Sequence, residues 1–248
     1  MKKTYFLLVG FIACSLQIAF AQKNSSSDAF ETQQKIYHQA MKRYDLQTAT
    51  VAMYNMIALK PTQLELNDSL ALLYFGQERY PQSYLLGEEI LKTNPEKTGI
   101  RELVASSKQN LGMLKESLAE YEKLYKDTKS LFFLYQAATL QYQLKRFGEC
   151  VASLEQILSS PETTKQKVTI RTQSGAQEVP MNAAALNIRG ICAMELNQPD
   201  AAKSNFIKAL EIYPEFALAK GNLESLDKHD NSQAAPASPL NTGPNPPR

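Results

Sequence analysis

Residues 182–214 show the hydrophobic period of two consecutive helices. Apolar or small residues recur there at helical spacing: Leu186, Gly190, Ala193 and Met194 in the first half, and Ala202, Phe206 and Ala209 in the second. The polar segment Asn197-Gln198-Pro199-Asp200 interrupts the pattern, and Pro214 ends the second helix. One such helix pair cannot bury its own apolar face, so it predicts further copies along the chain.

The same pattern recurs with a period of 34 residues. Pro61 and Pro95 each end an apolar segment and lie 34 residues apart. One position of every predicted second helix holds a small residue, with successive spacings of 34, 34, 33 and 52: Ala49, Ser83, Ser117, Cys150 and Ala202. A small side chain there allows the backbones of two crossing helices to approach each other. The spacing predicts five repeats, with one insertion before the last.

The repeat resembles the tetratricopeptide repeat family. The best-matching positions are Leu186, Gly190, Ala202, Phe206, Ala209 and Pro214, followed by Ala71, Tyr74, Tyr80, Ser83, Ile90 and Pro95. The third repeat departs from the family pattern, because it lacks the terminal proline and has Lys108 where an aromatic residue is usual. The resemblance implies an all-α fold, a right-handed α-solenoid of helix-turn-helix repeats near residues 30–63, 64–97, 98–130, 131–161 and 183–216.

The insertion, residues 162–181, has a β-type pattern. Residues 168–172 alternate and are β-rich, Ser174-Gly175 is a turn signal, and residues 177–179 provide a returning strand. We expect a short β-hairpin; an ordered loop is the alternative. As a protrusion from the solenoid, it is a candidate partner-binding element.

Two further segments follow the last repeat. Residues 216–228 carry another amphipathic pattern, which predicts a helix that caps the last apolar face. Residues 229–248 are rich in Pro, Asn, Ser and Ala, and we expect a disordered tail. Such a tail increases solubility or, alternatively, binds a partner as an extended segment.

The first 21 residues have the features of a secretory signal peptide. Lys2 and Lys3 precede an apolar run, and Ala19-Phe20-Ala21 matches a cleavage site before Gln22. Residues 22–29 then form a polar linker. A membrane anchor and lipidation at Cys14 are the alternatives. We therefore expect an exported protein of a bacterial periplasm or cell envelope, without a transmembrane span in the mature chain, and peripheral association with the envelope remains open.

Charge and cysteine content exclude some classes of function. Without Lys2 and Lys3, the 27 basic residues become 25 and equal the 25 acidic residues, so we expect no nucleic-acid partner. Removal of the leader leaves Cys150 and Cys192, which we interpret as two buried thiols, with a disulfide as the alternative. The sequence has no CxxC motif, so it has no local signature of redox catalysis or of a structural zinc site.

The sequence contains no catalytic motif. His38 and His229 are the two histidines, and neither has a second histidine nearby. The patterns HExxH, GxSxG, GxGxxG and GxxxxGK[ST] are all missing. We therefore expect a protein that is not an enzyme and has no catalytic residues, cofactor or metal.

The resemblance implies that the first helix of each repeat lines a concave groove. On our register its exposed positions include His38, Lys42 and Leu72, and the groove candidates for partner binding are Phe75, Phe132, Tyr135, Thr139, Tyr142, Asn187 and Ile191. The aromatic side chains would hold apolar side chains of a peptide, and Asn187 would bond its backbone. Alternatively, these aromatic residues pack against adjacent helices. Chaperone-binding members of the family hold a C-terminal carboxylate with Lys and Asn residues on these helices. Most of the equivalent positions hold other residue types in this chain, which argues against such a carboxylate-binding site.

These observations favour a non-catalytic scaffold or adaptor of the cell envelope that binds a protein or peptide partner through the groove. Two alternatives remain. The size, leader and repeat number are similar to those of the outer-membrane-protein assembly lipoprotein. A solenoid of this kind is also compatible with an accessory protein of polysaccharide uptake, which would bind a glycan or small ligand.

Overall fold

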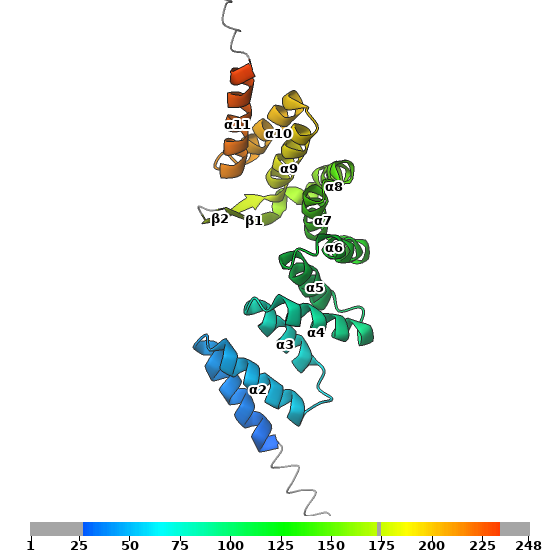
Figure 1. Ribbon diagram of the computed structural model, residues 1–248, viewed down its shortest axis with the longest axis vertical. Coiled ribbons are helices and arrows are strands. Elements are labelled where there is room, and N and C mark those ends of the chain that lie inside the picture. The colour runs from blue at the N-terminus through cyan, green and yellow to red at the C-terminus, as the bar shows by residue number, and fades with distance from the viewer. Residues whose placement is uncertain (1–26, 173–174, 234–248) are drawn as a thin grey trace, which may run out of the picture. The chain divides into compact units, whose positions relative to one another are not determined.

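The computed structural model describes residues 27–172 and 175–233, and helices dominate it (Figure 1). Consecutive helices form packed pairs: 27–42 with α2 (Leu46–Leu59), α3 (Glu65–Gly76) with α4 (Tyr80–Thr93), α5 (Thr98–Asn110) with α6 (Leu114–Thr128), α7 (Leu131–Gln143) with α8 (Phe147–Ser159), and α9 (Met181–Glu195) with α10 (Pro199–Ile212). A last helix, α11 (Ala217–Gln233), packs on α10. The predicted all-α repeat fold is confirmed.

The chain divides into two compact units between Glu120 and Tyr121, inside α6. We call them the N-terminal half, residues 27–120, and the C-terminal half, residues 121–233. Each half is described by itself below.

Each helix pair has the same connecting turn. One residue of the turn has a positive φ, at Tyr44, Glu78, Gly112, Lys145 and Asn197. The next residue donates its backbone N–H to the carbonyl five positions earlier, over 2.8–3.0 Å: Asp45 to Ala40, Arg79 to Tyr74, Met113 to Lys108, Arg146 to Gln141, and Gln198 to Ala193. This hydrogen bond satisfies a carbonyl that the end of the first helix leaves free. The turns follow the same spacing as the small residues, which supports the predicted register.

The small residues of the second helices lie at the helix crossings, as predicted. All five have no exposed surface. In two pairs the small residue also donates a hydrogen bond across the crossing: Ser83 Oγ to the Ala71 carbonyl (3.0 Å) and Ser117 Oγ to the Ala105 carbonyl (2.8 Å). The acceptors are the small residues of the first helices, so helix backbones approach closely at these crossings.

The N-terminal half contains a buried ion-pair network at Lys108. Its Nζ lies 2.8 Å from Glu88 and 3.2 Å from Glu120, and Glu120 also accepts from Arg101 at 2.8 Å. Burial lowers the pKa of Lys108, but its hydrogen bonds to Glu88 and Glu120 outweigh that effect and raise the pKa above its usual value. The departure of the third repeat from the family pattern thus has a structural role, because charge pairing replaces aromatic packing.

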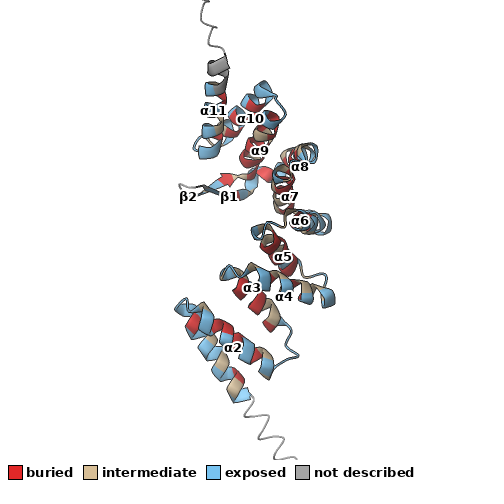
Figure 2. Ribbon diagram, in the orientation of Figure 1, coloured by how far each residue is buried: buried red, intermediate tan, exposed pale blue. Residues whose placement is uncertain are grey.

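The C-terminal half contains the predicted hairpin. A 3₁₀ turn (Pro161–Lys165) leads into β1 (Lys167–Thr172), which pairs antiparallel with β2 (Gly175–Pro180). Val168 and Val179 face each other in the register and are both buried in the main hydrophobic core of this half. Their burial anchors the hairpin to the helices. Figure 2 shows that core continuing through α9, most of whose residues are buried.

The hairpin also fixes the beginning of α11. The Gln177 side chain donates to the Glu215 carbonyl over 2.5 Å and accepts from the Ala217 N–H over 3.3 Å. Phe216 and Ala219 have no exposed surface and complete the same core. The last helix therefore covers the final pair, as a capping helix does.

The ends of the chain differ partly from expectation. The helix at 27–42 includes residues 27–29, which we assigned to the linker, and α11 continues past the expected end at Lys228 to Gln233. The expected signal peptide, Cys14 and residues 234–248 of the expected tail lie outside the described residues. Within the described part of the chain, no helix combines the length and apolar character needed to cross a bilayer.

Candidate functional site

The first helices of the repeats carry the candidate partner-binding residues. In the C-terminal half, α7 carries Phe132, Tyr135, Thr139 and Tyr142, and α9 carries Asn187 and Ile191. The two helices contact each other, so the fold brings these six residues onto neighbouring elements. Phe75 lies on α3 of the N-terminal half.

Tyr135 and Asn187 are buried, which corrects the expectation that both are exposed in the groove. Tyr135 is 9% exposed within the core of the C-terminal half, and burial raises its pKa to about 12. Asn187 is 3% exposed, and its Oδ1 accepts from Asn222 of α11 over 2.9 Å. The capping helix thus uses the hydrogen-bonding group that we expected a peptide to use. Whether either residue contacts a partner stays a prediction.

The other candidates in the C-terminal half are partly exposed. Phe132 packs edge-on against Phe133 with ring centroids 5.5 Å apart. The ring centroids of Tyr142 and Phe147 are 6.1 Å apart. Burial and the nearby Glu195 carboxylate raise the pKa of Tyr142. The backbone carbonyl of Tyr135 accepts the Thr139 hydroxyl over 2.9 Å. These rings contribute to packing and still present part of their surface to solvent.

Two further candidates also combine packing with partial exposure. Ile191 packs against the cluster that Phe206 and Leu226 form. Phe75 makes an edge-on contact with Tyr80, with ring centroids 5.5 Å apart, and packs against the core between α3, α4 and α5. Their partner-binding role stays a prediction.

An apolar cavity of about 230 Å³ opens on the first helices of the N-terminal half. We call it the first-helix cavity; its lining residues are Tyr37, Met41, Leu46, Ser69, Leu72, Leu73 and Gly76. Leu72 and Met41 are 57% and 37% exposed at its border. The groove register included Leu72 but missed Met41. The spacing of Tyr37 and Met41, four residues apart on one helix, is the signal that indicates this apolar stripe.

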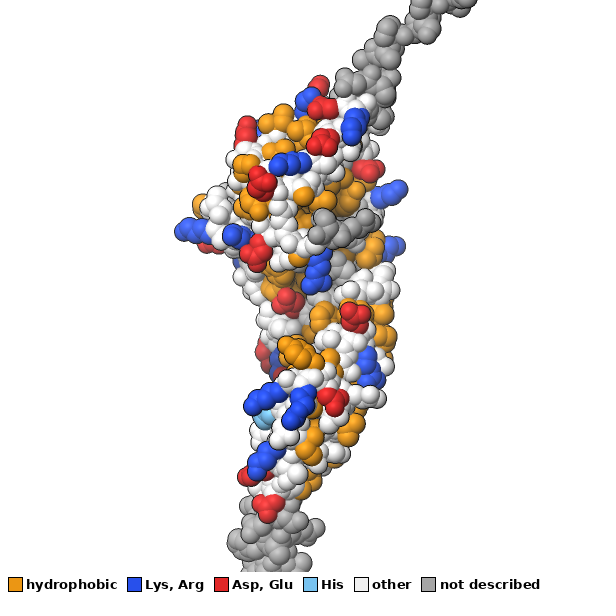
Figure 3. All heavy atoms as spheres, turned by 90° about the vertical axis from the view of Figure 1, so that its left-hand side faces the viewer, with side chains coloured by type: hydrophobic (Ala, Val, Ile, Leu, Met, Phe, Trp, Pro, Cys, Tyr) orange, Lys and Arg blue, Asp and Glu red, His pale blue; other side chains and the backbone are white. Residues whose placement is uncertain are grey.

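Basic side chains lie on the same helix as Tyr37 and Met41 of this cavity. Lys35, His38 and Lys42 are exposed at three- and four-residue spacing, so they share one stripe of the helix at 27–42. Figure 3 shows basic side chains gathered around the histidine on the surface of the N-terminal half. Lys42 also lies in the last turn of its helix, where a cation is favoured by the helix dipole. The site combines an apolar hollow with a positive border.

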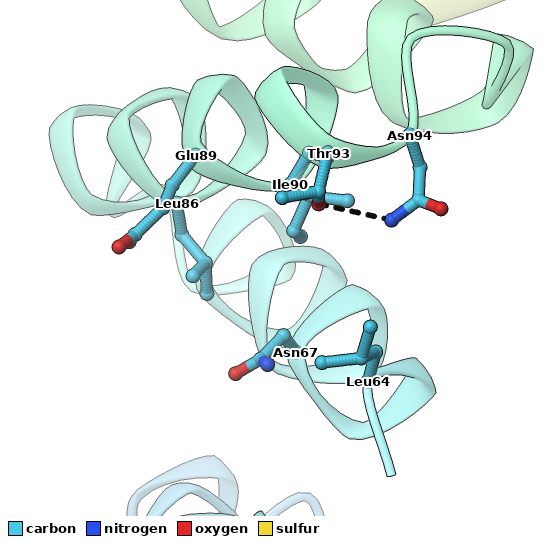
Figure 4. Close-up of a pocket in the computed structure, with 7 residues that line it drawn as sticks. All are labelled: Leu64, Asn67, Leu86, Glu89, Ile90, Thr93 and Asn94. Carbon is cyan, nitrogen blue, oxygen red and sulfur yellow. Dashed lines mark hydrogen bonds between the residues drawn. The ribbon is translucent and has the colours of Figure 1, made fainter. Parts of the chain in front are cut away.

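Two other cavities lie between α2, α3 and α4. One of about 510 Å³ is lined by residues that include Tyr54, Tyr74 and Leu85. The other, of about 260 Å³, lies between the beginning of α3 and the end of α4. Figure 4 shows Leu86 and Ile90 of α4 extending toward Asn67 and Leu64. Asn67, Glu89, Thr93 and Asn94 add polar groups to the lining of this smaller cavity, where Asn94 donates to the Thr93 hydroxyl over 3.0 Å.

The described residues contain no group of three His, Cys, Asp or Glu side chains that could hold a metal ion. His38 is an exposed surface residue of the first helix. The prediction that the protein is not an enzyme remains a prediction.

Comparison with known proteins agrees with the fold. Residues 183–216 match the model of the tetratricopeptide repeat. No curated protein sequence matches the chain significantly. Among solved structures, a tetratricopeptide repeat protein from Parabacteroides merdae has a TM-score of 0.66 at 16% identity, covering 84% of this chain and 75% of its own.

Two further solved structures share the fold. YrrB, a tetratricopeptide repeat protein with an unusual peptide-binding site, has a TM-score of 0.60 at 13% identity and covers 76% of this chain and 88% of its own. MamA from Desulfovibrio magneticus has a TM-score of 0.60 at 10% identity and covers 77% and 98%. Residues 183–216 thus match one tetratricopeptide repeat, and the recurring helix pairs of the chain share the fold of these solved tetratricopeptide repeat proteins.

Proposed function

We propose that the protein is a non-catalytic scaffold that binds a protein segment on the first helices of the N-terminal half. The first-helix cavity carries this proposal, because it combines exposed apolar side chains with a hollow large enough for one side chain of a partner. Leu72 and Met41 expose apolar surface to solvent. Covering this surface with a partner is favourable by about 25 cal/mol per Å² of apolar surface.

The border of the cavity indicates the chemistry of the segment. His38 and Lys42 lie beside Tyr37 and Met41 on the same helix, so a ligand in the cavity meets basic side chains at one edge. A segment with an apolar anchor residue followed by Asp or Glu matches this arrangement. The peptide-binding site of YrrB, which shares the fold, supports a peptide as the class of ligand.

A binding assay with a matched control tests the proposal. Peptides are selected by display against the full chain, and their affinities are measured by fluorescence polarisation. We expect Leu72→Ser to weaken binding at least about tenfold, which corresponds to about 1.4 kcal/mol. Leu85→Ser is the control, because Leu85 is exposed to the same extent, 56% against 57%, but lies on α4 outside this cavity. Loss of binding in the control alone would contradict the proposed site.

The basic side chains at the border of the cavity are tested by a separate measurement, the salt dependence of peptide affinity. Lys42→Glu should weaken binding of peptides with acidic residues and reduce the dependence of their affinity on salt. Peptides without acidic residues should bind both proteins equally. An unchanged salt dependence would exclude the proposed contact with acidic residues.

A second contact in the C-terminal half is proposed for the partly exposed Phe132, Tyr142 and Ile191. Their exposure and their common origin on α7 and α9 support it. Crosslinking of the partner to wild type and to Tyr142→Ala tests it, and an unchanged crosslink would remove Tyr142 from the site. Tyr135→Ala is unsuitable for this purpose, because the loss of a buried ring destabilises the core.

We also propose that the scaffold acts in a bacterial cell envelope. The sequence pattern of the first 21 residues supports this location. Mass spectrometry of the mature N-terminus distinguishes the alternatives: a start at Gln22 supports cleavage by signal peptidase, whereas a lipidated Cys14 supports a lipid-anchored protein. An uncleaved Met1 on a protein recovered from the cytosol would contradict export.

A further inference from the structure

Two thiols meet at the junction between the fourth and fifth repeats. Cys150 of α8 and Cys192 of α9 are separated by 42 positions in the chain, and their Sγ atoms lie 3.6 Å apart. Both side chains have no exposed surface and belong to the core of the C-terminal half. Neither residue is used by the proposed binding sites.

This pairing is particular to one junction. In the repeat register, the positions equivalent to Cys150 and Cys192 hold Ser83 and Ser107 at one earlier junction and Ser117 and Leu140 at the next. Two sulfur atoms therefore face each other only between α8 and α9 among these junctions. Thiols fill space as small apolar side chains do, but two facing thiols can also form a covalent bond.

The length of the connection gives the bond a physical role. The hairpin insertion lies between Ser159, where α8 ends, and Met181, where α9 begins. Other junctions have short connections, such as the one between Thr128 and Leu131. A longer connection holds its two ends together less effectively in the unfolded chain. A covalent link across this insertion therefore removes more entropy from the unfolded state than a link across a short turn.

We propose that Cys150 and Cys192 form a disulfide that joins α8 to α9. An S–S bond is about 2.05 Å long, so each sulfur has to move by less than about 1 Å from the observed separation. Rotation about the side-chain bonds of two helical cysteines supplies such a movement.

The reaction is a two-electron exchange with an external disulfide, such as oxidised glutathione. The Cys192 thiolate attacks one sulfur of the oxidant, and the other sulfur leaves as a thiolate. Cys150, after losing its proton, then attacks Cys192 Sγ and releases the second half of the oxidant as a thiolate. The oxidant is reduced to two thiols. The two cysteines can exchange these roles, because the oxidant reacts before α8 and α9 pack, when the folded-state contact between the thiols does not yet exist.

Burial determines when the bond forms. An oxidant cannot reach either sulfur while α8 and α9 are packed, because both side chains are completely covered. We expect fast oxidation during refolding and slow oxidation of the folded, reduced protein. The disulfide is therefore a link made as the chain folds.

The full chain, denatured and reduced, is refolded in a mixture of reduced and oxidised glutathione and digested without reduction. We expect a peptide pair that joins Cys150 to Cys192 and is lighter by two hydrogen atoms than the sum of its parts. The melting temperature should rise by roughly 10 °C relative to the reduced protein, and dithiothreitol should reverse the rise. Oxidised and reduced wild type are compared directly, so the test does not depend on a variant that folds.

Cys150→Ala provides the matched control. It should yield no linked peptide between these positions and no redox-dependent change in melting temperature. The proposal is overturned if wild type keeps both thiols free after refolding, if Cys14 is the partner of either cysteine, or if the bond forms without raising the melting temperature.

Discussion

At the residue scale, small side chains control how closely the paired helices approach. A Cβ atom added at Gly190 would lie 2.5 Å from the Phe206 ring, which has no exposed surface. The ring has little room to move within the close-packed core. Glycine is therefore required at this crossing, although it is unfavourable in the interior of a helix.

We predict that Gly190→Ala destabilises the protein by about 1–3 kcal/mol, because the Phe206 ring must shift. Gly221→Ala in α11 is the control, since no atom lies within 4 Å of its added Cβ. That change should stabilise α11 by about 0.5–1 kcal/mol through helix propensity. Urea denaturation followed by circular dichroism measures both changes, and equal signs would contradict the prediction.

Ser107 is a second site where one side chain decides stability. Its hydroxyl is fully buried and has no hydrogen-bond partner. Ser107→Ala removes this unsatisfied group and should increase the free energy of unfolding by about 1 kcal/mol. Ser117→Ala removes a hydroxyl that donates to the Ala105 carbonyl across the helix crossing, and it should decrease the free energy of unfolding. Thermal denaturation of the two variants distinguishes these opposite effects.

At the scale of elements, ion pairs join α5 and α6 of the third repeat to each other and join α5 to α4 of the second repeat. Glu120 is the shared acceptor of Arg101 and Lys108, whose side chains are only 9% and 8% exposed. Its loss leaves two buried cations with less compensation, whereas Glu88 is half exposed and keeps its access to water.

We predict that Glu120→Gln costs about 3 kcal/mol of stability and Glu88→Gln less than about 1 kcal/mol. Both substitutions keep the size of the side chain, so the comparison isolates the charge. Chemical denaturation at constant ionic strength provides the measurement. Similar costs for the two variants would contradict the prediction that the charge of the more buried Glu120 matters more than that of Glu88.

At the scale of the whole molecule, the balance of charges argues against nucleic acid as a partner. Residues 22–248 contain 25 basic and 25 acidic residues, and the described part of the chain forms ion pairs on several helices. A neutral surface releases few counterions on contact with phosphates. We predict no detectable shift of double-stranded DNA or RNA in gel mobility assays at 150 mM salt and micromolar protein; salt-dependent binding would contradict this.

The pattern along the chain determined the helix pairs, their period and the hairpin. These features follow from local periodicity, because residues three, four or seven positions apart share one helix face and alternate residues share one strand face. The positions of the small residues at the crossings were also predictable, since the same packing recurs in every repeat. The left-handed turn residues Tyr44, Glu78 and Lys145 were missed, as their side chains carry no turn signal.

Only the tertiary structure decided which groove residues remain available. Tyr135 and Asn187 have the spacing of first-helix residues, yet the core and α11 cover them. The first-helix cavity, the Lys108 network and the contact between Cys150 and Cys192 likewise depend on residues that are distant in sequence. Local periodicity assigns each residue to a face of its own helix. What that face meets depends on packing between repeats, and this packing determines which side chains can bind a partner.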